Sequence, residues 1–326
     1  MRSVTGLHHV TAIAGSPQEN LDFYTGILGV RLVKKSVNQD DPGTYHLFYA
    51  DAEGNPGTDL TFFPWTAMAP SRPGHGLSVE VALAVPPGTL RFWGERLERH
   101  GVPFDAVEAR FGERALPLTD PHGLRVALVE SEDSVARKVA PWVDSPVAAD
   151  RQIRGLHAVR LWEASLAPTS DFLANVLGLR GVGEESGWHR YLAPGGTSGR
   201  IVDVREVTDA RRGAWGIGSI HHVAWRVDDE EHQAEVRQRV EDSGRRPTPV
   251  IDRFWFKSVY FAEPGGVLFE LATDGPGFAI DEDAGHLGER LVLPPWLEPE
   301  RQQIEASLPA LTHGRKPARL RTPRAQ

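Results

Sequence analysis

Two pairs of neighbouring histidines and one glutamate could together hold a metal ion in this 326-residue chain. The pairs are His8-His9 and His221-His222, which stand in the similar contexts LHHVTAI and IHHVAWR. Glu270 lies in the apolar run VLFELAT, typical of a buried strand, where a carboxylate needs a cation or strong hydrogen-bond donors. Two imidazoles and one carboxylate on one face of a metal leave positions open for substrate and O2, as in non-haem Fe(II) oxygenases, although Mn(II) or Zn(II) could also bind. A single core histidine more often only finds a hydrogen bond, but the repeated context of these pairs favours a metal.

The residue pattern alone does not decide which histidine of each pair faces the metal. Side chains alternate between the two faces of a strand, so one face would carry His9 and Thr11 and the other would carry His8. In the same way, His222 and His221 would point to opposite faces. Alternation separates the neighbours and leaves both choices open.

The elements that must position these residues come from an internal repeat. TGLHHVTAI from Thr5 and RGLHAVRLW from Arg154 align at a constant offset, and related openings start at Leu77 and Ser219. Each opening is followed by a helix-like stretch and by short alternating runs between Gly and Pro turns, such as YHLFYAD and SVYFAEP. The repeat predicts an α+β fold of four β-α-β-β-β units, at about residues 6–65, 76–132, 154–206 and 218–273.

A single unit of this kind leaves one sheet edge open, and two units side by side close that edge into a cup. Four units therefore predict two open, cup-like sheets. We expect an N-terminal domain over residues 1–150, a C-terminal domain over 151–274 and an extension over 275–326.

Composition excludes several classes of protein. The chain has no cysteine, so disulfides and thiolate metal sites are absent, and a reducing, cytoplasmic location fits. A formal charge of −8 argues against a general nucleic-acid binder, and the basic run over residues 315–324 is expected to be a solvated terminus. No apolar stretch approaches the length of a membrane span, and the first residues lack the apolar segment of a secretory signal.

Longer motifs resemble a known family. HHVTAI…LDFYTGILG, HHVAWRV and VLFELATD resemble the vicinal-oxygen-chelate superfamily, which includes glyoxalases, bleomycin-resistance proteins and extradiol dioxygenases. The long run NQDDPGTYHLFYADAEGNPGTDLTFF is similar to ring-cleaving dioxygenases that act on hydroquinones, and the resemblance spans about residues 6–300. It implies that Fe(II) is held by His9, His222 and Glu270. It also implies that the first unit forms the metal-containing cup with the fourth, and that the second unit pairs with the third.

The same resemblance implies catalytic or supporting roles for His8, Thr11, His221, Arg253 and Tyr260. Arg253 lies among aromatic residues in DRFWF, where a cation could stabilise an anionic substrate. Tyr260 could donate to substrate or oxygen, although core tyrosines are common, and His8 and His221 could equally be packing residues. The remaining histidines, among them His46, His75, His100, His122 and His286, are expected to have surface or structural roles.

We therefore expect an Fe(II)-dependent dioxygenase that opens the ring of a hydroquinone-type aromatic diol with O2. No other cofactor, no nucleic acid and no membrane partner is expected, and homo-oligomers are compatible with the family. An extradiol catechol dioxygenase would need a third-unit histidine where Ala158 stands, and a glyoxalase-type metal isomerase would need a fourth ligand, for which only Glu80 of the other cup is available. A metal-free protein that binds aromatic compounds, as resistance proteins of the superfamily do, is the alternative of another class.

Overall fold

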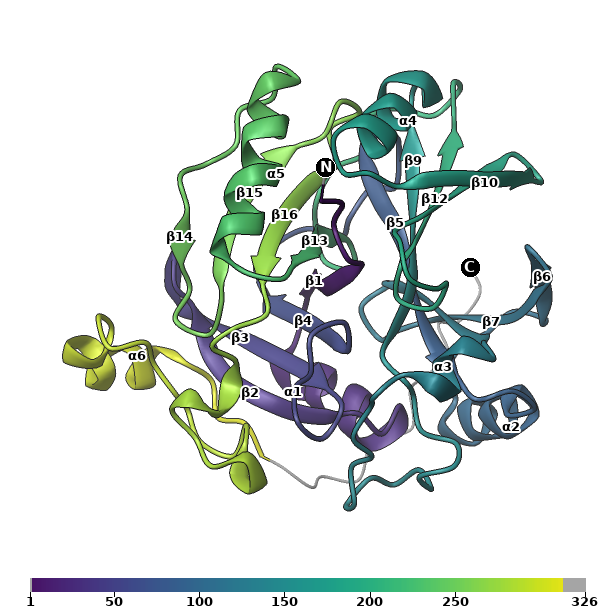
Figure 1. Cartoon of the computed structure of the whole chain (residues 1–326). Coiled ribbons are helices and arrows are strands. Elements are labelled where there is room, and N and C mark those ends of the chain that lie inside the picture. Colours follow the sequence, from purple (N-terminus) through teal and green to yellow (C-terminus); the bar gives the residue numbers. More distant parts are fainter. Residues whose placement is uncertain (1, 313–326) are drawn as a thin grey trace.

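Residues 2–312 are described by a computed structural model and form two eight-stranded sheets (Figure 1). The basic run over residues 315–324 lies outside the described residues. The first sheet has the order β14-β15-β16-β13-β1-β4-β3-β2. Its strands are β1 (Leu7–Ala14), β2 (Arg31–Asn38), β3 (Asp41–Ala50), β4 (Asp59–Pro64), β13 (Ile220–Val227), β14 (Ile251–Asp252), β15 (Lys257–Ala262) and β16 (Leu268–Thr273).

The second sheet has the order β10-β11-β12-β9-β5-β8-β7-β6. Its strands are β5 (Leu77–Val85), β6 (Glu108–Arg110), β7 (Glu113–Thr119), β8 (Arg125–Glu130), β9 (Leu156–Glu163), β10 (Arg180–Glu185), β11 (Trp188–Leu192) and β12 (Ile201–Glu206). The first sheet therefore combines units one and four, and the second combines units two and three. The predicted α+β fold and the predicted pairing of its units are confirmed. The domain boundaries at residues 150 and 274 stay a prediction.

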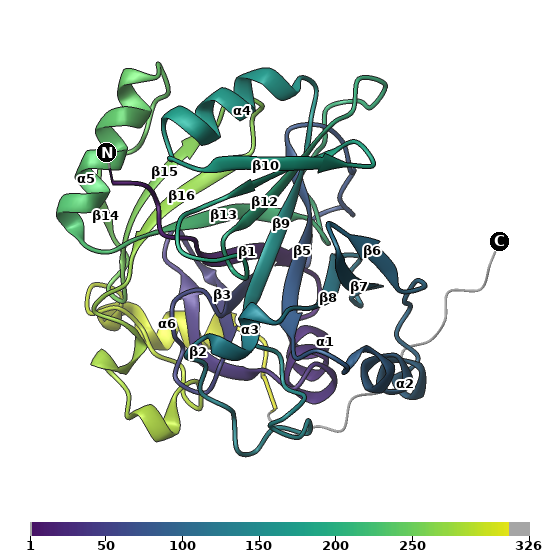
Figure 2. The ribbon, with the colours of Figure 1, turned by 45° about the vertical axis from the view of Figure 1, so that its right-hand side comes forward.

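One helix follows the first strand of each unit. These helices are α1 (Pro17–Leu21), which continues into the helical turn η1 (Asp22–Ile27), α2 (Leu90–His100), α4 (Leu166–Asn175) and α5 (Glu230–Asp242). In α2 the buried Leu90, Trp93 and Leu97 are three and four residues apart and share one face, and Gly101 ends the helix in the left-handed conformation, at φ +70°. Figure 2 shows α5 outside the first sheet, where it packs on β13, β15 and β16. The helices therefore cover the faces of the sheets that point away from the cups.

The two sheets share one buried apolar cluster, which includes Val10 and Val223 of the first sheet and Val81 and Val159 of the second. The seam of the first sheet is the antiparallel pair of β1 and β13, and the seam of the second is β5 and β9. Both cups therefore open away from a common core. No helix within residues 2–312 combines the length and the apolar character that a membrane crossing requires.

The seam of the first sheet is irregular at both histidine pairs. On β1, Leu7 pairs with Trp225 and His9 pairs with Ala224, the next residue of β13. His8 therefore has no partner of its own and is the extra residue of a β-bulge. On β13 the corresponding extra residue is His221. The rings of His8 and His9 both lie 5.3 Å from the ring of Phe256. The expectation that these two neighbours face opposite sides of the strand is therefore wrong, because a bulge interrupts the alternation.

The extension packs against the first sheet, beside β2 and β3 (Figure 1). Its short elements are η2 (Phe278–Ile280), η3 (Ala284–His286), η4 (Glu298–Glu300) and α6 (Arg301–Ser307), and the connector after the second unit holds α3 (Asp133–Ala136). Phe278 packs with Trp255 and Phe48, and Ile304 packs with Val37. The extension thus closes one side of the first cup.

Candidate metal centre

Three side chains from the first cup converge on one point. His9 Nε2 and His222 Nε2 lie 3.2 Å and 3.0 Å from Glu270 Oε2, and the two nitrogens lie 3.2 Å apart. Ligands at about 2.1 Å from a metal are separated by about 3.0 Å at right angles and by about 3.4 Å in a tetrahedron. Within residues 2–312, this is the only group of three or more histidine or acidic side chains whose ligand atoms lie within 4.8 Å of one another. The geometry therefore fits a single metal ion.

The glutamate itself indicates a cation. Glu270 is completely buried, and its Oε2 has no well-aligned hydrogen bond among the described residues. Burial would raise the pKa of Glu270, but the imidazoles of His9 and His222 hold that pKa well below its usual range. An ionised carboxylate with an unshared buried oxygen, facing two imidazole nitrogens, fits a divalent ion.

Hydrogen bonds at the bulge orient the first imidazole. His8 Nε2 lies 3.1 Å from the Thr273 carbonyl oxygen, which can only accept, so this nitrogen carries the proton of His8. Burial and the neighbouring His9 lower the pKa of His8 to about 3, so the ring is neutral and its Nδ1 accepts. His9 Nδ1, 2.9 Å away, must then donate. The lone pair of His9 is thereby left on Nε2, facing Glu270.

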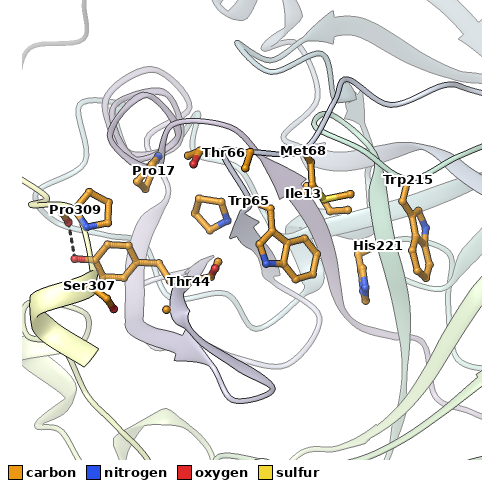
Figure 3. Close-up of a pocket in the computed structure, with 14 residues that line it drawn as sticks. Ile13, Pro17, Thr44, Trp65, Thr66, Met68, Trp215, His221, Ser307 and Pro309 are labelled. Atoms are coloured by element: carbon orange, nitrogen blue, oxygen red, sulfur yellow. Dashed lines mark hydrogen bonds between the residues drawn. The ribbon is translucent and has the colours of Figure 1, made fainter. Parts of the chain in front are cut away.

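The second bulge repeats this arrangement. His221 Nδ1 lies 2.8 Å from His222 Nδ1, and burial together with His222 lowers the pKa of His221 to about 3. The ring of His221 stacks on Trp215 at 4.6 Å and borders an apolar cavity of about 640 Å³, also lined by Trp65 and Met68 (Figure 3). His8 and His221 were each expected to be either packing residues or supports for the metal site. Each contacts the imidazole of the histidine that follows it, His9 and His222 respectively.

Glu270 is oriented by a residue that the sequence analysis missed. Ser258 Oγ donates to Glu270 Oε1 over 2.5 Å, so only Oε2 is left to face the histidines. Ser258 and Tyr260 lie on the same face of β15, and Tyr260 is the cross-strand partner of Glu270. The alternation of SVYF, combined with the pairing of β15 and β16, would have identified Ser258.

A small cavity of about 40 Å³ adjoins the two imidazoles. It is enclosed by residues of β2, β3 and the turn between them, by the imidazole of His9 and the ring of Phe63, and by five residues of the fourth unit. The lining residues are His9, Asn38, Gln39, Asp40, His46, Phe48, Phe63, His222, Arg253, Trp255, Phe256 and Tyr260. Phe48 and Trp255 are thus wall residues of this cavity.

Arg253 and Tyr260 lie together at this cavity. Arg253 forms a two-point ion pair with Asp40, at 2.8 Å and 3.3 Å, and its guanidinium lies 5.5 Å from the centre of the Tyr260 ring. Burial and Glu270 raise the pKa of Tyr260, so its hydroxyl is protonated at neutral pH. Burial would lower the pKa of Arg253, but Tyr260 and Asp40 raise it. The cavity therefore offers one hydroxyl donor and one permanent cation.

Thr11 does not line the cavity and is linked to it by hydrogen bonds through Thr61 and His46. Its Oγ1 lies 2.7 Å from Thr61 Oγ1, which lies 2.9 Å from His46 Nε2. His46 sits in the cavity wall against Phe48 and Phe63, with ring centres 3.8 Å and 4.4 Å away. Burial, His9 and His222 lower the pKa of His46 well below its usual range, so the ring is neutral. The expectation of a surface position for His46 is therefore wrong, because strand β3 turns it into the cup with Phe48, and a structural role stays a prediction.

The second cup is filled by ion pairs. Glu80 binds Arg110 at 2.5 Å, and Arg190 bridges Asp203 and Glu113 at 2.8 Å and 2.9 Å. The small side chains at the other repeated positions, such as Ala158 and Ala127, belong to a separate apolar cluster. The described part of this cup therefore satisfies its charges internally.

Comparisons with known proteins agree with this geometry. The pattern of the Glyoxalase/Bleomycin resistance protein/Dioxygenase superfamily matches residues 6–128 and 155–271. MhqO of Bacillus subtilis (strain 168), provisionally named a ring-cleaving dioxygenase, is 44% identical over 94% of this chain and 96% of its own length. The chlorohydroquinone/hydroquinone 1,2-dioxygenase of Sphingobium indicum is 34% identical over 92% of this chain and 95% of its own length.

Solved structures extend the comparison. A crystal structure from Bacillus subtilis, described provisionally as a dioxygenase, is 42% identical, covers 96% of this chain and 99% of its own, and superposes with a TM-score of 0.90. Glyoxalase I from Zea mays shares the fold, with a TM-score of 0.61 over 82% of this chain and 92% of its own at 15% identity. The chain belongs to the glyoxalase/bleomycin resistance protein/dioxygenase superfamily.

Proposed function

We propose that this protein is a dioxygenase that opens the ring of a hydroquinone-type aromatic diol with O2, using Fe(II) held by His9, His222 and Glu270. The observation that carries the proposal is the triangle of two imidazole nitrogens and one unshared carboxylate oxygen, with separations of 3.0 to 3.2 Å. The names of MhqO and of the Sphingobium hydroquinone dioxygenase support the reaction type. The two-histidine, one-carboxylate ligand set supports iron, because it leaves adjacent positions for two further ligands.

Bound iron would supply a Lewis acid for a ring hydroxyl and an electron path between the ring and O2. The protein's own residues would do the rest. Tyr260, protonated because burial and Glu270 raise its pKa, would donate a hydrogen bond to a substrate oxygen. Arg253 would stabilise the negative charge of an ionised diol, and Asp40 would hold the guanidinium in place.

The cavity walls would position the ring and keep water away from it. Phe48, Phe63, Trp255 and Phe256 provide flat apolar surfaces around the imidazoles. At about 40 Å³, the cavity has room for about three water molecules, so a six-membered ring would enter by displacing water and moving a wall side chain. A small diol, not an extended aromatic compound, is the substrate that this space favours.

The test is an oxygen-electrode assay of metal-depleted protein reloaded separately with Fe(II), Mn(II) and Zn(II). Hydroquinone, methylhydroquinone, chlorohydroquinone and catechol are the substrates, and the product formed under labelled O2 is weighed by mass spectrometry. We expect one O2 per hydroquinone, two labelled oxygen atoms in the opened product and activity with Fe(II). Glu270→Gln should lose both metal and activity, whereas Glu113→Gln, a partly buried carboxylate of the second cup, should keep both.

Each alternative has its own result. Faster turnover of catechol than of any hydroquinone would identify an extradiol catechol dioxygenase. Tight binding of aromatic compounds by protein that takes up no metal would identify a binding protein. Failure of the Fe(II)-loaded protein to consume O2 with any of the four diols would overturn the proposal, and isomerase activity without O2 uptake would replace it with a glyoxalase-type reaction.

A further inference from the structure

A third cavity, of about 660 Å³, lies away from the metal ligands, where units one, three and four meet the connector that follows unit two. Four cations line it, Arg137, Lys138, Arg200 and Arg226, against a single carboxylate, that of Asp133. Arg226 is already neutralised by both oxygens of Asp274, at 2.5 Å each. The other three cations form no ion pair with any described residue.

Arg137 is held entirely by neutral acceptors. It donates to the carbonyl oxygens of Leu156 and Gly57, at 2.5 Å and 2.9 Å, and to Ser198 Oγ at 3.3 Å. Burial, followed by the charges of Arg200 and Arg226, lowers the pKa of Arg137 to about 10. These bonds explain how Arg137 ties the units together, but they leave its charge uncompensated beside two further arginines.

The backbone around these cations is rich in glycine, from Pro194 to Arg200 in the segment PGGTSGR. A Cβ at Gly199, where φ is +80°, would lie 3.1 Å from the Arg137 guanidinium. A Cβ at Gly195, where φ is +95°, would lie 2.9 Å from Arg200 Nη1. Glycine at these positions therefore lets the guanidinium groups lie directly against the main chain.

The same loop presents unused main-chain donors. The N–H groups of Gly195, Gly196 and Ser198 have no acceptor within residues 2–312, whereas Thr197 N donates to Asp133 Oδ2 at 3.0 Å. Free main-chain N–H groups beside arginine side chains are common surroundings of a bound oxyanion. A guanidinium fork matches the oxygens of a phosphate group better than it matches a halide.

We propose that this cavity binds a phosphate-class oxyanion, held by Arg137, Lys138, Arg200 and the N–H groups of the glycine-rich loop. The anion could be free or carried on an organic molecule, since the recognised group is the same. The cavity is independent of the dioxygenase chemistry. The bound anion would, however, touch the segments that lead into β1 and β12, because Thr5, Leu7 and Gly199 also line the cavity.

The test is calorimetric titration of the full-length, metal-loaded protein with inorganic phosphate, pyrophosphate and AMP at constant ionic strength. We expect one saturable site per chain, with a Kd at least tenfold weaker in Arg200→Gln/Lys138→Gln. Arg200→Lys should lose less, because it keeps the charge. Arg91→Gln is the matched control, because that arginine is 91% exposed and pairs only with Glu95. Arg137 is not altered, because its carbonyl bonds link separate units.

The three ligands distinguish the sources of the anion. Pyrophosphate or phosphate binding without AMP binding would indicate a bare oxyanion, and comparable AMP binding would indicate a phosphate carried on an organic group. Phosphate bound at the metal instead would survive the double substitution. The proposal is overturned if the double variant binds like the wild type, or if none of the three ligands binds the wild type at low millimolar concentration.

Discussion

The Nδ1 atoms of His8 and His9 lie 2.9 Å apart, although these residues are neighbours on one strand. A regular strand would point the two rings to opposite faces, and the bulge at His8 brings them together. The same relationship at His221 and His222, at 2.8 Å, is produced by the bulge on the partner strand. The seam of the sheet thus supplies each metal-facing imidazole with its own hydrogen-bond partner, and at His9 the Thr273 carbonyl behind His8 also fixes the tautomer.

Replacing His8 should weaken metal binding without removing a ligand. His8→Phe keeps a ring of similar size but cannot accept from His9 Nδ1, so the His9 ring loses its fixed tautomer and orientation. We expect the affinity for Fe(II) to fall by about 10- to 100-fold, measured by competition with a chelator. His157→Phe is the matched control, because His157 holds the same repeat position in the second sheet and pairs with Glu113. Unchanged affinity in His8→Phe would contradict the orienting role.

Ser258 should affect metal binding by orienting the carboxylate of Glu270. Ser258→Ala removes the donor to Glu270 Oε1 and frees the carboxylate to rotate, so we expect a loss of metal affinity of about tenfold or more. Ser36→Ala, which removes a buried hydroxyl without a partner, is the control for the loss of one oxygen from the same sheet. If both variants bind metal equally well, the hydrogen bond of Ser258 does not orient the ligand.

Tyr260 should act in turnover more than in metal binding. Its raised pKa keeps the hydroxyl protonated, and Tyr260→Phe removes that donor while keeping the ring near His222, 5.5 Å between centres. We expect kcat with hydroquinone to fall by about 100-fold or more, with metal content unchanged. Steady-state assays at saturating O2, with iron measured on the same samples, separate the two effects. A variant with full kcat would exclude Tyr260 as a proton donor.

The repeat and the family motifs were sufficient to predict the four units, their pairing and the residues His9, His222 and Glu270 that meet in space. What they could not predict depends on cross-strand register. The bulges are visible only once β1 and β13 are aligned, because an extra residue is defined by its partner strand. For the same reason, the sequence did not single out Ser258, which acts across the pairing of β15 with β16.

Two side chains of the first cup, His46 and Arg253, also could not be placed from the sequence, because their contacts join residues on different strands or far apart in the chain. His46 was expected to have a surface or structural role, and its place in the cavity depends on how β3 pairs with β4. The ion pair of Arg253 and Asp40 joins residues 213 positions apart, which no local pattern records. Local periodicity identifies the face of a strand, whereas the shape of the cup decides which faces meet.

The packing of the extension against the first sheet should depend on one buried cation, Lys34. Lys34 is completely buried and its Nζ binds Asp281 Oδ1 at 2.7 Å and Glu282 Oε2 at 2.5 Å. Lys34→Met leaves both carboxylates without the ammonium, so we expect a loss of about 3–5 kcal/mol of unfolding free energy in urea titrations. Adding Glu282→Gln should restore part of this loss. Equal stability of Lys34→Met and wild type would show that the extension does not depend on the ion pair.

Glu163 should make the protein less stable as pH rises. Its side chain is completely buried, neither carboxylate oxygen has a hydrogen-bond partner, and burial followed by Glu263 raises its pKa to about 9. Between the ordinary value of 4.5 and about 9, the folded protein holds a proton that the unfolded chain has released. The folded state therefore loses stability progressively as pH rises through that window, and Glu163→Gln, which carries no charge at any pH, removes this loss. Urea titrations at pH 5.5 and 8.5 should show the advantage of Glu163→Gln over wild type growing by at least about 1 kcal/mol, whereas the exposed Glu95→Gln serves as the control. A constant difference between Glu163→Gln and wild type across this range would mean that Glu163 is already ionised in the folded protein.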